Sequence, residues 1–157
     1  MHDLCTVQPA RISDAAEIAG MSAALIESGL PHTWTADRVG RHIRHRECAV
    51  LSARSGHELV GFAIMQFGDA SAHLNLLAVR PHVRRRGLGR QMLDWLHESA
   101  IVAGTFTINL ELRAGNVDAR RFYLSMGYTE SGHVHRYYSA LEDAVRMTRN
   151  LTVQEIP

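Results

Sequence analysis

The stretch Val79–Leu93, VRPHVRRRGLGRQML, contains three consecutive arginines, a Gly-Leu-Gly segment and the start of an amphipathic run. Pro81 ends the strand-like segment before the arginines, and apolar residues at helical spacing follow the glycines. A helix N-terminus presents unpaired backbone N–H groups and the positive end of the helix dipole. Glycines let the backbone approach a ligand closely, and arginines attract negative charge. The stretch therefore indicates a turn between a strand and a helix that can bind a polyanionic ligand.

Other interpretations of the same turn are a solvated basic turn and a dinucleotide-binding loop. The second has some support, because Glu111 follows about 20 residues later, where a ribose-binding acid is expected. It is disfavoured because Met92 stands in the place of the third glycine and the strands before the turn are predicted to be antiparallel. A Walker-type phosphate loop does not fit, since no Gly-Lys-Ser/Thr follows the glycines.

Strand-like and helix-like segments surround this turn. The predicted strands are Cys5–Ala10, Ala49–Ala53, Glu58–Gln66, Ala72–Val79, Phe106–Leu112, Tyr128–Val134 and Ala144–Leu151. The predicted helices are Ala15–Glu27, Ala36–His45, Leu88–Gly104 and Val117–Met126. We expect an α/β fold with a mixed, mostly antiparallel sheet flanked by helices. Because no repeat, low-complexity tract or linker occurs, residues 1–157 are expected to form a single domain.

The composition is typical of a globular protein, with 157 residues of which 46% are hydrophobic and 21% are charged. The 17 Lys and Arg residues against 16 Asp and Glu residues leave a net charge of +1, which argues against bulk nucleic-acid binding. No apolar run reaches the roughly 20 residues of a membrane span, and no export signal is recognised at the N-terminus. We therefore expect a cytoplasmic protein.

The cysteines and histidines do not predict a metal centre. Cys5 and Cys48 lie far apart without a partner spacing. His42 and His45 are three residues apart on a predicted helix, and the pair His133 and His135 is two residues apart on a predicted strand. Neither histidine pair has an evident acidic or cysteine companion, so no metal is expected.

The segment LLAVRPHVRRRGLGRQML resembles the acetyl-CoA-binding motif of the GCN5-related N-acetyltransferase (GNAT) family, Gln/Arg-x-x-Gly-x-Gly/Ala, which is met by Arg84, Gly87 and Gly89. The resemblance implies a sheet that splays beside Val79 to admit acetyl-CoA. The backbone of Arg85–Arg90 would cradle the pyrophosphate, and Leu77–Val79 would pair with the pantetheine arm as a strand edge. The implied cofactor-binding residues are Leu77, Ala78, Val79, Arg84, Arg85, Arg86, Gly87, Leu88, Gly89, Arg90, Asn116, Ala119 and Tyr123.

The segment LELRAGNVDARRFYLSMGY, Leu110–Tyr128, is similar to a second block of this family, and more narrowly to the bacterial ribosomal-protein alanine N-acetyltransferases. The matching residues are Glu111, Arg113, Asn116, Ala119, Tyr123 and Gly127, whereas Leu112, Phe122 and Tyr128 depart conservatively. The later segment HRYYSALEDAVRM resembles the ending of the same subfamily. Together the matches extend from about residue 74 to residue 151.

The expected chemistry needs a base and an acid. An amine attacks a thioester only as the free base, and α-amino groups with a pKa near 7.7–8.0 are partly protonated at neutral pH. Glu111 would take that proton directly or through one water, and Tyr123 would protonate the departing thiolate. Asn116 would hold the pantetheine chain or cap the helix that follows. Transfer would be direct, because neither cysteine lies in a matched block.

The acceptor is the least determined part of this prediction. Trp34 is expected to help form the acceptor groove opposite Tyr137 and Tyr138, although it could equally be core packing. The favoured acceptor is the N-terminal α-amino group of a protein such as a small-subunit ribosomal protein. The alternatives are a lysine side chain, a small-molecule amine, or a non-catalytic module that senses acyl-CoA. Direct nucleic-acid or membrane partners are not expected, and the chain could be a monomer or a homodimer.

Overall fold

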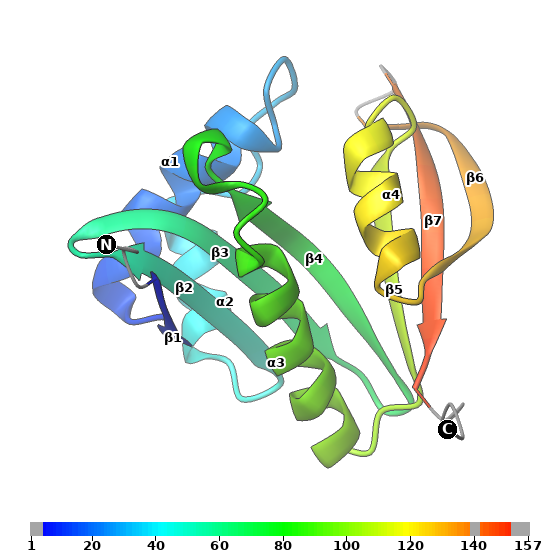
Figure 1. Cartoon of the computed structure of the whole chain (residues 1–157), viewed down its shortest axis with the longest axis horizontal. Helices are drawn as coiled ribbons and strands as arrows, with labels where there is room; N and C mark the ends of the chain where they lie inside the picture. The colour runs from blue at the N-terminus through cyan, green and yellow to red at the C-terminus, as the bar shows by residue number, and fades with distance from the viewer. Residues whose placement is uncertain (1–4, 139–141, 152–157) are drawn as a thin grey trace.

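The computed structural model describes residues 5–138 and 142–151, which form a seven-stranded sheet with helices on both faces (Figure 1). The strands, in the sheet order β1-β2-β3-β4-β5-β7-β6, are β1 (Cys5–Pro9), β2 (Cys48–Ser55), β3 (Glu58–Phe67), β4 (Ser71–Val79), β5 (Thr107–Arg113), β7 (Glu142–Asn150) and β6 (Thr129–Tyr138). Every neighbouring pair is antiparallel except β4 with β5. The predicted α/β fold with a mixed, mostly antiparallel sheet is confirmed.

Four α-helices and two short 3-10 helices complete the described chain. They are η1 (Ile12–Asp14), α1 (Ala15–Leu25), α2 (Ala36–Arg44), η2 (Pro81–Val83), α3 (Leu88–Val102) and α4 (Val117–Ser125). In the part of the chain that the structure describes, none of these helices is both long and apolar enough to span a membrane.

The strands β4 and β5 meet at one end only. Three residue pairs join them in parallel, and the last of these pairs is His73 with Asn109. Beyond His73, β4 continues to Val79 while β5 turns away, so that the two strands are close at one end and apart at the other (Figure 1). The splay expected beside Val79 is therefore present, and it begins immediately after His73.

A bulge in β4 lies at the start of this splay. The register with β3 shifts between Ile64 and Met65, so that Asn75 has no partner between Leu74 and Leu76. A bulge changes the face on which the following side chains lie. Accordingly, Leu74 packs with the core under α3, whereas Leu76 packs with the core under α1 and α2.

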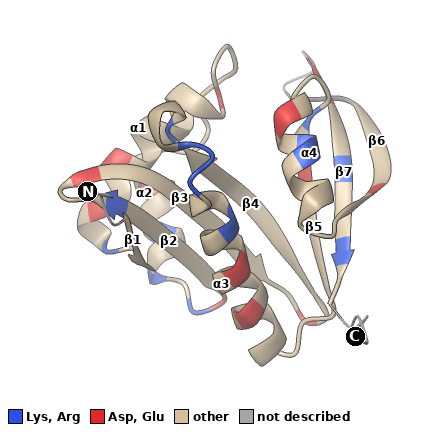
Figure 2. Cartoon of the chain, in the orientation of Figure 1, with Lys and Arg blue, Asp and Glu red and all other residues tan. Residues whose placement is uncertain are grey.

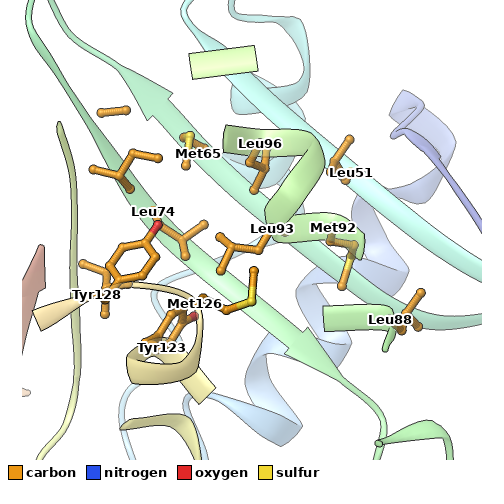
Figure 3. Close-up of a cluster of buried hydrophobic side chains, with 14 of the residues drawn as sticks. Leu51, Met65, Leu74, Leu88, Met92, Leu93, Leu96, Tyr123, Met126 and Tyr128 are labelled. Carbon is orange, nitrogen blue, oxygen red and sulfur yellow. The ribbon is translucent and has the colours of Figure 1, made fainter. Parts of the chain in front are cut away.

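The sheet separates two hydrophobic clusters. The larger one lies between the sheet and the helices α3 and α4 (Figure 3), and its members with essentially no exposed surface include Met65, Met92, Leu93, Leu96 and Ile108. The smaller one lies between the sheet and the helices α1 and α2, with Ile18, Val39, Phe62 and Ile64 at its centre. Apolar surface removed from water on both faces fixes the sheet between two helical layers.

Helix α1 ends at Leu25, two residues before the predicted end at Glu27. The Glu27 carboxylate is buried and accepts hydrogen bonds from the backbone N–H of Thr33 (2.7 Å), the Thr33 hydroxyl (2.9 Å) and the backbone N–H of Trp34 (3.1 Å). A buried carboxylate is tolerated when such donors satisfy it. The loop between α1 and α2 is thus organised around Glu27, a role that helical periodicity does not reveal.

The buried histidine His97 connects α3 to the strands at the end of the chain. Its Nε2 lies 2.8 Å from the Tyr128 hydroxyl, and its Nδ1 lies 3.2 Å from a guanidinium nitrogen of Arg149. The same Arg149 nitrogen donates to the carbonyl of Met126 (2.6 Å). Burial, with the positive charge of Arg149, lowers the pKa of His97 to about 4. The imidazole is therefore neutral at physiological pH.

Candidate active site

A cleft of about 800 Å³ opens where β4 and β5 separate. The β4 side contributes residues 74–79, the β5 side contributes residues 110–113, and α4 and the loop before α3 form the remaining walls. The predicted cofactor-binding residues that line this cleft are Leu77, Ala78, Val79, Arg84, Arg85, Gly87, Leu88, Gly89, Arg90, Asn116, Ala119 and Tyr123. Arg86 is exposed and lies outside the lining. The structure thus brings two distant sequence blocks to one cavity.

The loop before α3 has a conformation suited to binding an anion. Gly87, at the N-cap of α3, has φ +78°, and Arg85 has φ +66°, a conformation that is uncommon for a residue other than glycine. Arg84 donates from Nε to the carbonyl of Val79 at 3.0 Å, which ties the loop back to β4. In Figure 2 the loop that leads into α3 is blue, the colour of Lys and Arg. The free N–H groups at the start of α3 therefore lie among cationic side chains.

Gly89 lies beside the second sequence block. A Cβ at this position would lie 3.4 Å from the ring of Phe122 on α4, at the near limit of ordinary van der Waals contact. Glycine therefore keeps the start of α3 clear of the Phe122 ring.

Asn116 caps helix α4. Its side-chain oxygen accepts a hydrogen bond from the backbone N–H of Ala119 at 3.1 Å. This is one of the two roles expected from the sequence, and it satisfies a backbone donor in the first turn of the helix. Because Asn116 and Ala119 both line the cleft, the cap also fixes the N-terminal end of the α4 wall.

Glu111 lines the cleft from β5, with only 10% of its side chain exposed. One carboxylate oxygen lies 3.0 Å from Nε2 of His73 on β4, and the other lies 3.1 Å from Nε of Arg146 on β7. The hydrogen bond from His73, opposed by burial and supported by Arg146, holds the pKa of Glu111 below its usual value. Glu111 is therefore an ionised carboxylate at neutral pH.

Tyr123 reaches the same cleft from α4 and is 7% exposed. Its ring packs edge-on against Tyr128, with ring centroids 5.4 Å apart, and against Phe122 at 5.1 Å. Such contacts hold an aromatic ring in one orientation. Tyr123 and Glu111, which lie in one sequence block, thus line the same cavity.

Trp34, which was predicted to help form the acceptor groove, does not line the cleft. Trp34 is 8% exposed and packs in the core beneath α1 and α2, with the Arg38 guanidinium 3.8 Å above its ring and the His42 ring at 4.8 Å. It does not belong to the cleft lining, and its position is that of a core residue. Tyr137 and Tyr138 end β6, but their side chains lie outside what the structure describes.

Sequence reasoning missed several residues of the site. Leu25 and Ile26 line the cleft from the end of α1, and Asn75 lines it at the β4 bulge with a buried side-chain oxygen that has no hydrogen-bond partner among the described residues. Arg113 forms an ion pair with Glu142 and donates to the carbonyl of Ser28 at 2.9 Å. These contacts depend on strand register and loop path, so no local pattern could have indicated them.

The expectation that His133 and His135 lack an acidic companion is wrong. His133 and His135 do have an acidic companion, because Asp143 on β7 lies 2.8 Å from Nε2 of His133 and 2.9 Å from Nδ1 of His135. The pairing of β6 with β7 brings Asp143 beside them, although it belongs to the next strand of the chain. Within residues 5–138 and 142–151, no group of three or more His, Cys, Asp or Glu side chains could hold a metal ion.

Comparisons with known proteins agree with this geometry. The family model described as "Acetyltransferase (GNAT) domain" matches residues 45–130. The [ribosomal protein bS18]-alanine N-acetyltransferase of Salmonella typhimurium is 36% identical over 100 residues, which cover 62% of this chain and 68% of that protein. The Escherichia coli protein of the same name is 37% identical over 93 residues, covering 57% and 63% respectively.

Solved structures show the same fold. The ribosomal-protein-S18-alanine N-acetyltransferase from Escherichia coli superposes with a TM-score of 0.79 at 25% identity, covering 97% of both chains. Ard1 from Thermoplasma volcanium gives a TM-score of 0.82 at 22% identity, covering 96% of this chain and 99% of that one. The matched region contains the loop before α3, Glu111 and Tyr123. The chain therefore belongs to the GNAT family of acetyltransferases.

Proposed function

We propose that this protein transfers the acetyl group of acetyl-CoA to the N-terminal α-amino group of a protein. The observation that carries the proposal is that Glu111 on β5 and Tyr123 on α4 line the same cleft. The basic loop before α3 lines the same cleft and would neutralise the phosphates of coenzyme A. The residues that we propose as base, acid and anion site thus line a single cavity.

The residues of the cleft fit acetyl-CoA. When bound, acetyl-CoA supplies an acetyl thioester that is reactive towards amines. Arg84, Arg85, Arg90 and the free N–H groups at the start of α3 would hold the pyrophosphate. The part of β4 beyond His73 lacks β5 as a neighbour, so the edge of Leu77–Val79 that faces away from β3 can pair with an extended chain of amides, with the Val79 carbonyl already accepting from Arg84.

Glu111 and Tyr123 each have one role in proton transfer. Glu111 is ionised and faces the cleft, so it draws a proton from the acceptor ammonium directly or through one water. Tyr123 lines the same cleft from α4, and its hydroxyl supplies a proton to the leaving sulfur. Arg146 and His73 fix the orientation of the Glu111 carboxylate. The reaction is therefore a direct transfer that requires no cysteine.

A protein N-terminus is supported as the acceptor by the names of the two ribosomal-protein alanine acetyltransferases. An α-amino group also suits the site chemically, since it is deprotonated more easily than a lysine side chain with a pKa near 10.4. Leu25 and Ile26 form an apolar edge of the cleft, which suits a small first residue such as alanine. A ribosomal protein is the acceptor that we favour.

Two peptides test the choice of acceptor. One has a free N-terminal alanine and arginine at every lysine position, and the other is N-terminally blocked with its lysines intact. Incubation of each peptide with the protein and acetyl-CoA is followed by mass spectrometry. We expect one acetyl group on the first peptide and none on the second. Acetylation of the blocked peptide alone would contradict the N-terminal acceptor and favour lysine.

A further inference from the structure

Arg113, the last residue of β5, connects the two arms of the splayed sheet. Its Nε donates to one oxygen of the Glu142 carboxylate on β7 at 2.8 Å, and its Nη2 donates to the other oxygen. Its Nη1 donates to the backbone carbonyl of Ser28 at 2.9 Å and lies 3.4 Å from the carbonyl of Ile26. These two carbonyls belong to the end of α1, which packs on β3 and β4, and to the loop that follows it. The guanidinium therefore joins the arms at the end where β4 and β5 lie apart.

Glu111 and Arg113 face the same side of the sheet, because side chains alternate along a strand. Leu110 and Leu112, which alternate with them, pack in the cluster under α3 and α4. Glu111 and Arg113 therefore face the side of α1 and α2, in agreement with the hydrogen bond from Arg113 to Ser28. An acceptor amine that gives its proton to Glu111 must approach on this side, past the loop between α1 and α2.

The loop between α1 and α2 is ordered internally, and Arg113 attaches it to β5. The Glu27 carboxylate accepts hydrogen bonds from residues later in the loop, and Arg113 contacts the carbonyls of the two residues that flank Glu27. Leu25 and Ile26, next to this attachment, line the cleft together with Glu111. The position of this apolar edge relative to Glu111 therefore depends on Arg113.

Arginine suits this connection better than lysine. A guanidinium is a planar fork of five N–H donors, so that one edge can bind a carboxylate while the remaining nitrogen binds carbonyls in another direction. The hydrogen bond from Arg113 lowers the pKa of Glu142, so the carboxylate is charged at neutral pH. Both side chains are partly exposed, and such ion pairs contribute little to stability. Loss of the pair is therefore expected to affect the position of the loop more than the folding of the chain.

We propose, on the basis of the function proposed above, that Arg113 is a positioning residue that holds the loop between α1 and α2 at a fixed distance from Glu111 and thereby selects acceptors with a small first residue. Arg113 takes no part in proton transfer. With the loop attached, the edge formed by Leu25 and Ile26 admits an alanine side chain beside Glu111 and disfavours a longer one. With the loop released, the acceptor amine is held less well and longer side chains are admitted.

The test compares a peptide that has a free N-terminal alanine with the same peptide beginning with leucine. The native protein should prefer alanine. We expect Arg113→Met to lower kcat/KM for the alanine peptide by about tenfold or more and to reduce the preference for alanine over leucine by about tenfold, because a pocket discriminates by size only while its walls are fixed. The KM for acetyl-CoA should change by less than about twofold, since the loop before α3 is unaltered.

The pair of Arg120 with Glu130 provides a matched control. Its ion-pair distance is 3.1 Å and its side chains are 35% and 47% exposed, compared with 25% and 41% for Arg113 and Glu142, but neither residue lines the cleft. Arg120→Met should leave kcat/KM and the preference for alanine as in the native protein. Calorimetric titration of acetyl-CoA into Arg113→Met should give the native affinity, which shows that the variant is folded.

Two further variants separate positioning from charge. Arg113→Lys keeps the charge but lacks the fork, so it should lose the preference for alanine as Arg113→Met does. Glu142→Gln should reduce this preference in the same direction, and it should have no further effect in Arg113→Met, because the carboxylate acts through the guanidinium. Both variants carry the same test if Arg113→Met does not fold.

Three outcomes would overturn the proposal. One is a loss of kcat/KM in Arg113→Met that is equal for the alanine and leucine peptides. Another is native behaviour of Arg113→Lys, and the third is additive effects of the substitutions at Arg113 and Glu142. Failure of the proposed function is distinguishable, because the native protein would then acetylate neither the alanine peptide nor the leucine peptide.

Discussion

Glu111→Gln should lower kcat for a peptide with a free N-terminal alanine by about 100-fold or more, the range in which a removed general base falls. The amide keeps the shape of the side chain but cannot draw a proton from the ammonium. The loss should be greatest at low pH, where more of the amine is protonated and base catalysis matters most. Affinity for acetyl-CoA should remain nearly unchanged, since the basic loop before α3 is intact.

The measurement is kcat from about pH 6 to about pH 9, together with calorimetric titration of acetyl-CoA into both proteins. Glu58→Gln is the matched control, because Glu58 also pairs with a histidine but lies outside the cleft lining. Equal kcat in Glu111→Gln and the native protein across this range would show that Glu111 is not the base. If physiological activity persisted as well, the non-catalytic acyl-CoA-sensing alternative would gain support.

Stability should decrease as the pH falls from about 6.5 to about 4, because of His97. Burial and the charge of Arg149 lower the folded-state pKa to about 4, whereas the unfolded chain has an ordinary value near 6.5. The unfolded state therefore binds the proton first. The contribution of the neutral ring is fully present above pH 6.5 and is lost progressively below it. Its upper limit is about 3 kcal/mol of unfolding free energy, from the difference between the two pKa values.

Urea unfolding at about pH 7.5 and about pH 4.5 measures this effect in the native protein and in His97→Gln. The glutamine can still donate to the Tyr128 hydroxyl but has no titrating group, so the variant should lose less stability between the two values. The carboxylates that also titrate at low pH are common to both proteins, and Asp14, whose pKa is lowered, is one of them. If the native protein and His97→Gln lost equal stability between the two pH values, His97 would not be a source of the pH dependence.

The sequence was sufficient to predict the loop before α3 because its function resides in contiguous backbone. Gly87 has the positive φ that favours glycine, and Gly89 lies beside the ring of Phe122. The pairing of Glu111 with Tyr123 in one cavity was implied by the resemblance, since both lie in a single strand-to-helix block. Local patterns suffice where the site is built from neighbours in sequence.

The partners of Glu111 could not be predicted in this way. His73 and Arg146 lie on two other strands, and the register of β4 with β5 and of β5 with β7 decides which side chains face Glu111. The same reason explains why Asp143 was not recognised as the companion of His133 and His135. For Trp34 the sequence left two positions open, the acceptor groove and the core, and the structure has it in the core beneath α1 and α2.

Hydrogen exchange with and without acetyl-CoA tests most directly the central claim, that the splayed end of β4 and the loop before α3 together bind the cofactor. We predict that acetyl-CoA slows exchange of the backbone amides in Leu77–Val79 and Arg85–Arg90, because both segments contribute residues to the cleft lining. The exposed end of α3 around Val102 should be unaffected. Protection elsewhere in the chain, with none in these two segments, would contradict the account.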